Sequence, residues 1–253
     1  MREDDRADLV HHLEELRSRI IRSIAYVGVL TMVGWFFYDH AYRLLMLPVT
    51  KAATAAGGKI IFANPLEAFW VRVQVSVVLG VLAAGPLVFW EIWSFVAPGL
   101  RRSERRALLP LLPISAVLGL AGAALCYAVS FRMFPWVIAL APPGVQPLFR
   151  MSETVLLIAK LLLAFAASFQ MPIILIFLVK VGIVSPDFLA AKRREAIIGL
   201  VILSAVVTPT GDAITMLMLA APLYLLYEGT VVVARFIYRR REAAIKESIA
   251  PSP

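Results

Sequence analysis

The stretch AIIGLVILSAVVTPTGDAITMLMLAAPLYLLY, residues 196–227, decides how this chain folds. Its 32 residues contain a single charged side chain, that of Asp212. One continuous helix of this length would measure about 48 Å, well beyond the bilayer hydrocarbon core of about 30 Å. Pro209 and Gly211 break the run near its middle and indicate a turn. The stretch therefore predicts two short membrane-crossing helices, over residues 196–209 and 213–234.

The composition of the whole chain agrees with a membrane location. Hydrophobic residues make up 60% of the 253 and charged residues only 17%, and the mean hydropathy is +0.82. Soluble domains carry about 25% charged residues, so a lipid-embedded chain is indicated. Four more apolar runs are long enough to cross a bilayer, over residues 20–38, 73–96, 107–129 and 154–181. Glu91 alone interrupts the second run, and we expect it to be interfacial or paired.

The placement of arginine and lysine tests this count of six helices. If the N-terminus is cytoplasmic, the cytoplasmic segments together with Arg22 hold 17 arginines and lysines, and the external segments hold six. This bias follows the positive-inside rule, whereas a five-helix arrangement would leave the basic stretch RFIYRRR (235–241) outside. We predict an all-α polytopic membrane protein with six transmembrane helices, the last two short, and both termini cytoplasmic. Residues 1–235 would form a single domain, followed by a basic flexible tail over 236–253.

Several classes of function find no support in the sequence. The positive-inside bias accounts for the net charge of +8, so no nucleic-acid partner is needed. Cys126 is the only cysteine, which excludes an intrachain disulfide. No HExxH motif, P-loop or Cys/His cluster occurs, so we expect no enzyme activity, no cofactor and no metal site. A small-solute or ion carrier is the alternative function, although ionisable residues that could line a path are scarce in the middle of the spans.

The stretch HHLEELRSRI, residues 11–20, places acidic residues just before the first apolar run. In a helix, Glu15 lies away from the apolar stripe and on the polar face with Arg19. One interpretation is an ordinary i, i+4 ion pair, worth about 0.3–0.5 kcal/mol. The other is a carboxylate that receives a cationic ligand, with Glu104 in the first cytoplasmic loop, between the second and third predicted spans, as a second carboxylate. Such a pair would suit two guanidinium groups, whose planar fork matches carboxylates.

Two further polar positions interrupt the apolar runs. Gln170 lies near the middle of the fourth run, with Pro172 just after it. A buried amide in hydrocarbon needs partners, so Gln170 is either a helix–helix hydrogen bond or a functional polar group. Asp212 lies at the turn between the last two predicted helices, where a carboxylate can cap the sixth helix.

A series of motifs follows in a fixed order along the chain. They are HLEELRSRI (12–20), FANPLEAF (62–69), PLVFWEIWSFVAPGLRRSERR (86–106), FQMPIILIFLVKVGIVSP (169–186), VVTPTGDAIT (206–215) and APLYLLYE (221–228). Together they resemble the TatC family, the core receptor subunit of the twin-arginine protein translocase. The resemblance runs from about residue 12 to residue 228, and it implies the same six-helix arrangement with both termini cytoplasmic.

The resemblance also implies where a ligand binds. In the family, acids matching Glu15 and Glu104 bind the twin-arginine motif of signal peptides. Arg17 would belong to the same surface, and Phe95 would shape the loop that carries Glu104; the alternative is that Phe95 only helps to end the second helix. Pro48 matches a family proline in the external region, where the alternative is a simple helix breaker.

Two of the polar positions gain a role from the resemblance. The family has Glu or Gln at the position of Gln170, facing a concave interior. Because an amide does not titrate, Gln170 would act by hydrogen bonding to a signal peptide or a partner helix, beside Pro172. Asp212 would take a conformational or coupling role in addition to capping.

The resemblance finally implies partners and an energy source. The location would be the bacterial cytoplasmic membrane, and export of folded proteins would be driven by the proton-motive force. The partners would be single-span TatA/TatB-like proteins, together with self-association in the complex. Two short last helices would leave a hydrophobic mismatch that thins the membrane or draws in partner helices.

Overall fold

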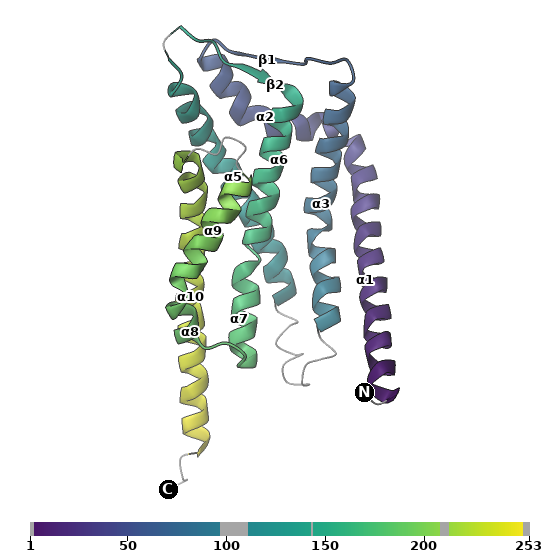
Figure 1. Ribbon diagram of the computed structural model, residues 1–253, viewed down its shortest axis with the longest axis vertical. Coiled ribbons are helices and arrows are strands. Elements are labelled where there is room, and N and C mark those ends of the chain that lie inside the picture. The colour runs from purple at the N-terminus through teal and green to yellow at the C-terminus, as the bar shows by residue number, and fades with distance from the viewer. Residues whose placement is uncertain (1–2, 97–110, 143, 208–212, 250–253) are drawn as a thin grey trace. The chain divides into compact units, whose positions relative to one another are not determined.

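The computed structural model describes residues 3–96, 111–142, 144–207 and 213–249 (Figure 1). The chain divides into two compact units, Met1–Ala166 and Ala167–Pro253, where the sequence predicts a single domain. Each unit is described by itself.

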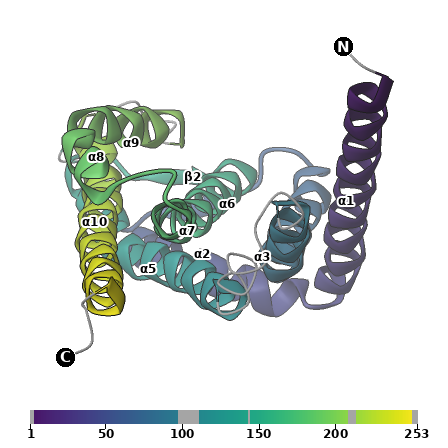
Figure 2. The same cartoon turned by 90° about the horizontal axis from the view of Figure 1, so that it is seen from below.

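The first unit contains most of the long helices. These are α1 (Glu3–Phe36), α2 (Tyr38–Ala55), α3 (Glu67–Val96), α5 (Leu111–Ala139) and the greater part of α6 (Met151–Ser168). Helices α1 and α3 lie side by side in both views (Figures 1 and 2). Strands β1 (Lys59–Ile61) and β2 (Leu148–Arg150) form a short parallel pair, at the same end of this unit as α2 (Figure 1).

One carboxylate ties together the two segments that enter α3 and α6. Glu67, the first residue of α3, is 5% exposed. Its Oε2 accepts a hydrogen bond from the backbone N–H of Ala63 at 2.7 Å, and its Oε1 accepts one from the backbone N–H of Ser152 at 2.8 Å. A carboxylate at a helix start satisfies donors that have no partner within the helix. Glu67 therefore fixes the start of α6 beside the start of α3.

The second unit is smaller and contains α7 (Met171–Val181), α8 (Pro186–Ala191), α9 (Arg193–Val207) and α10 (Ala213–Ile249). Gly182 ends α7 in the left-handed conformation, with φ of 89°. Tyr227 on α10 donates a hydrogen bond from its hydroxyl to the carbonyl oxygen of Leu189 in α8. Arg193 at the start of α9 forms an ion pair with Glu228 on α10 through two nitrogens, at 2.6 and 2.9 Å. These contacts hold α8 and α9 against α10.

The predicted all-α membrane class is confirmed, with α-helices making up most of the described chain. Five stretches are long and apolar enough to cross a membrane, and α9 supplies a sixth helix. The five stretches are His12–Phe36, Glu67–Phe95, Pro113–Ala139, Met151–Val181 and Met216–Arg239.

The boundaries of several helices differ from those predicted. The third predicted span ended at Val129, before the charge of Arg132, but α5 continues to Ala139 with Arg132 exposed on its surface. The fourth span is divided into α6 and α7. Helix α9 has 15 residues and is short, as predicted, whereas α10 has 37 residues and includes most of the segment 236–253 that was expected to be flexible.

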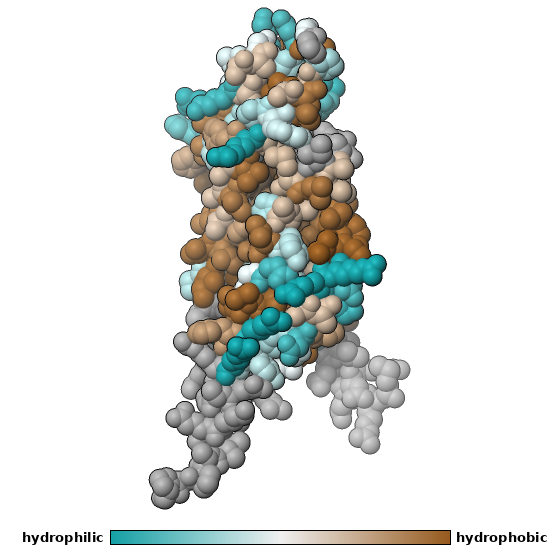
Figure 3. Space-filling model, turned by 90° about the vertical axis from the view of Figure 1, so that its left-hand side faces the viewer, coloured by the Kyte–Doolittle hydropathy of each residue, from teal (hydrophilic) through white to brown (hydrophobic). Residues whose placement is uncertain are grey.

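The surfaces of the helices suit a lipid environment. Hydrophobic side chains cover most of the middle of the face shown in Figure 3, and hydrophilic ones gather nearer the ends. On α9, Ile198, Ile202 and Val206 follow each other at intervals of four and are 51%, 57% and 76% exposed. An apolar stripe left exposed on a helix is the surface that lipid or another membrane helix covers.

The packing of α1 against α3 depends on two glycines. A Cβ atom on Gly80 of α3 would lie 2.6 Å from the backbone nitrogen of Thr31 and closer still to its hydroxyl oxygen. A Cβ atom on Gly34 of α1 would lie 3.0 Å from the carbonyl oxygen of Ser76. Small residues let helix backbones approach closely in membranes, where packing rather than the hydrophobic effect drives association.

We predict that Gly80→Ala destabilises the protein, because the added methyl group must push α1 away from α3. Overpacking of this kind costs roughly 1–3 kcal/mol. Gly85→Ala is the matched control, since Gly85 lies on the same helix and a Cβ there meets nothing within 4 Å. Thermal unfolding in detergent should show a lower Tm for Gly80→Ala than for Gly85→Ala; equal values would contradict the packing argument.

Candidate functional site

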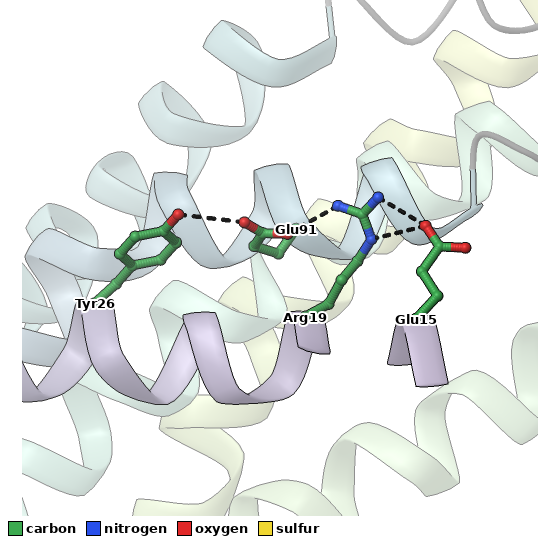
Figure 4. Close-up of polar contacts among 4 residues, drawn as sticks. All are labelled: Glu15, Arg19, Tyr26 and Glu91. Atoms are coloured by element: carbon green, nitrogen blue, oxygen red, sulfur yellow. Dashed lines mark hydrogen bonds and ion pairs between the residues drawn. The ribbon is translucent and has the colours of Figure 1, made fainter. Parts of the chain in front are cut away.

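The polar side chains of α1 form an ion pair one helical turn in length (Figure 4). Arg19 donates from Nε at 3.2 Å and from Nη2 at 2.8 Å to Oε1 of Glu15. The two side chains are 20% and 23% exposed, so both are largely but not fully shielded from solvent. The i, i+4 pair that the spacing allowed is thus present, and Glu15 accepts a guanidinium through two nitrogens.

The same guanidinium continues across to α3. Its Nη1 donates to Oε2 of Glu91 at 2.8 Å, and the Glu91 side chain is only 5% exposed. The hydroxyl of Tyr26 donates to the other oxygen of Glu91 at 3.3 Å. Arg19 therefore bridges two carboxylates on different helices, as Figure 4 shows. Glu91 is thus paired, as expected. Its partners Arg19 and Tyr26 lie 72 and 65 positions away in the chain, so no local sequence pattern predicts them.

A hollow of about 360 Å³ opens beside this ion pair. Its lining consists of Glu14, Glu15, Ser18, Arg19 and Arg22, all from α1. Both carboxylates of the HLEELRSRI stretch therefore border one polar recess. A cationic group that entered this recess would meet Glu15 together with its present partner, Arg19.

An aromatic contact joins the end of α3 to the start of α1. The rings of His12 and Phe95 stack with centroids 4.4 Å apart and planes at 23°. His12 lies nearly one helical turn before Glu15, so Phe95 is adjacent to the site. Glu104 lies outside the described residues. Arg17 is exposed on α1, and the structure records no ion pair or hydrogen bond from its side chain among the described residues.

Pro48 lies inside α2, and the helix continues through it instead of breaking. Proline has no N–H, so the carbonyl four residues earlier loses its helical donor. That carbonyl belongs to Leu44, and its oxygen accepts a hydrogen bond from the hydroxyl of Tyr127 on α5 at 2.9 Å. A side-chain donor from a neighbouring helix thus replaces the missing backbone donor.

Gln170 and Pro172 lie at the interruption between α6 and α7 in the second unit. Gln170 is 4% exposed. Its backbone carbonyl oxygen accepts hydrogen bonds from the backbone N–H groups of Ile173 and Ile174, at 3.1 and 3.2 Å. Pro172 is buried in the first turn of α7, where a missing N–H costs nothing. Gln170 therefore lies between two helices and not inside one continuous helix. Asp212 lies outside the described residues.

This arrangement defines a class: a multi-pass, all-helical membrane protein with a carboxylate–guanidinium network at one end of its first helix pair. Residues 11–222 match the family model for the Sec-independent protein translocase protein (TatC). A TatC from Carboxydothermus hydrogenoformans is 32% identical over 93% of this chain and 96% of its own, and one from Desulforapulum autotrophicum is 34% identical over 98% and 91%.

A solved structure agrees with these relatives. A crystal structure of the twin-arginine translocase receptor TatC matches with a TM-score of 0.80 at 29% identity, over 89% of this chain and 98% of that one. The chain belongs to the TatC family, and it is a core subunit of a Sec-independent protein translocase that serves protein transport in the Tat pathway.

We predict that the Tyr127 hydroxyl stabilises the protein mainly because of Pro48. Tyr127→Phe should lower stability by about 0.5–1.5 kcal/mol, since it removes the hydrogen bond to the carbonyl of Leu44. In a Pro48→Ala background the backbone N–H is restored, and Tyr127→Phe should then cost much less. Thermal unfolding in detergent of the wild type, the two single variants and the double variant gives the coupling free energy between Tyr127 and Pro48. Additive effects of the two substitutions would contradict the idea that the hydroxyl replaces the missing backbone donor.

Proposed function

We propose that this chain is the receptor subunit of its translocase and binds twin-arginine signal peptides at its cytoplasmic face through Glu15. The observation that carries this proposal is that Glu15 already accepts a guanidinium, from Nε and Nη2 of Arg19, beside a polar recess of about 360 Å³. The carboxylate is therefore oriented for the group that such a peptide presents twice. Arginine is preferred to lysine because its planar fork offers two parallel donors.

A second carboxylate would bind the second arginine, and Glu104 is our candidate. It follows Phe95 by nine positions, and Phe95 stacks on His12, nearly one helical turn before Glu15. Nine residues of extended chain reach up to about 30 Å, so the chain length allows Glu104 to approach the recess. Exposed Arg17 and the ring of Phe95 would complete the contact surface.

The remaining parts of the proposal concern location, partners and energy. The excess of arginine and lysine in alternate segments supports cytoplasmic termini in the bacterial cytoplasmic membrane. Helix α9 spans only about 22 Å and exposes an apolar stripe, which supports recruitment of single-span TatA/TatB-like partners or further copies of this chain. We propose that the proton-motive force drives export of the folded cargo.

Two polar residues would contribute within the membrane and at its outer side. Buried Gln170, at the interruption between α6 and α7, would hydrogen bond to a signal peptide or a partner helix and could not carry protons. We propose that Asp212 is a turn residue with a coupling role.

The test of the receptor function is binding of a synthetic twin-arginine signal peptide to the purified protein in detergent. Glu15→Gln should weaken binding by at least tenfold, because a charged hydrogen-bond pair is worth about 1.5–3 kcal/mol. Glu14→Gln is the matched control: it removes the same charge from the same recess, and we expect a change of less than threefold.

A peptide with two lysines in place of the arginines should bind the wild-type protein weakly. Equal losses in Glu14→Gln and Glu15→Gln would reduce the effect to general electrostatic attraction. Unchanged binding in folded Glu15→Gln would place the peptide elsewhere on the protein.

A further inference from the structure

We propose that Arg19 is an internal competitor for Glu15, and that Glu91 retains the Arg19 side chain when a peptide guanidinium displaces it. This inference rests on the proposed function, because it concerns the same carboxylate. It assigns to Arg19 and Glu91 a role in setting the affinity for the peptide, without direct contact between Glu91 and the peptide.

Arg19 binds Glu15 and Glu91 through different nitrogen atoms, and this makes the exchange of guanidinium groups on Glu15 possible. Arg19 uses Nε and Nη2 for Glu15, and a different nitrogen, Nη1, for Glu91. The bonds to Glu15 can therefore break while the bond to Glu91 persists. A peptide guanidinium that entered the recess would take over Oε1 of Glu15, and Arg19 would stay on α3's carboxylate (Figure 4).

Glu91 is suited to hold the displaced side chain. Its side chain is 5% exposed, and the Tyr26 hydroxyl donates to Oε1, which leaves Oε2 directed to Arg19. An arginine at this depth without a carboxylate would be costly, since buried charges need a partner. Glu91 thus lowers the cost of releasing Glu15.

The competition has a quantitative consequence. In the exchange that we propose, the peptide guanidinium takes the Oε1 atom that Arg19 now occupies. The apparent Kd then equals the intrinsic Kd divided by the fraction of molecules in which Arg19 has left that atom. If one molecule in ten is released, removal of the competitor tightens binding tenfold. The factor belongs to the free protein, so it is the same for any cationic peptide. Arg19 therefore weakens the binding of arginine and lysine peptides by the same factor, and the preference for arginine comes from Glu15.

The decisive variant is the double substitution Arg19→Gln with Glu91→Gln. It removes one positive and one negative charge, so the net charge of the site is unchanged, and it leaves no buried carboxylate without a counter-charge. We expect the twin-arginine peptide to bind this variant about five- to tenfold more tightly than wild type. The twin-lysine peptide should gain by the same factor.

Glu91→Gln alone should act in the opposite direction. With no second carboxylate, Arg19 stays on Glu15, and the peptide should bind severalfold more weakly than to wild type. Arg19→Lys serves if the double variant fails to fold, because one ammonium group cannot hold both carboxylates as the guanidinium fork does. It should tighten binding by about two- to fivefold.

The outcomes separate the two proposals. If Glu15→Gln abolishes binding in both the wild-type and the double-variant background, the receptor function holds. If the double variant, or Arg19→Lys in its place, then binds with wild-type affinity or more weakly, the competitor role of Arg19 is wrong. If Glu15→Gln changes nothing in either background, the receptor function itself fails.

Discussion

A charge inside a membrane-spanning helix must find a partner, and the pairing of α1 with α3 depends on how this chain meets that requirement. Glu91 is the charge, Arg19 and Tyr26 are its partners, and all three are brought together because glycines let the two helices approach. The ion pair and the close approach support each other. Gly80 lets the two backbones approach at Thr31, and without Arg19 the packed pair would bury a carboxylate with no counter-charge.

The helical class and the membrane-crossing stretches were predictable from hydrophobic run lengths and charge placement, because the thickness of a bilayer constrains both. The residues at which helices end were less predictable from the sequence. The third span is predicted to end at Val129, but α5 continues past Arg132 to Ala139, because a long charged side chain near a helix end can reach the interface. The tail after Arg235 is basic and was expected to be flexible, yet α10 extends through it to Ile249.

The candidate site was only half predictable. Spacing alone suggests the contact of Arg19 with Glu15, because residues four apart share a helix face. The contact with Glu91 depends on which face of α1 meets α3, and that is a property of the packed pair. The same holds for Pro48, whose lost donor is visible in the sequence while the replacement, Tyr127, lies 79 positions later. A single acid in an apolar run does, however, indicate that the folded protein must supply a partner for it.

Glu67 joins a segment that is synthesised early to one that is synthesised much later. Its two oxygens hold a donor that precedes it by four residues and a donor that follows it by 85. As the chain emerges from the ribosome with its N-terminus first, the local bond to Ala63 can form at once, and Glu67 then waits for Ser152. The start of α6 thus has a prepared acceptor before it is made. The start of the last long helix of the first unit is thus positioned by a residue that lies 85 positions earlier in the chain.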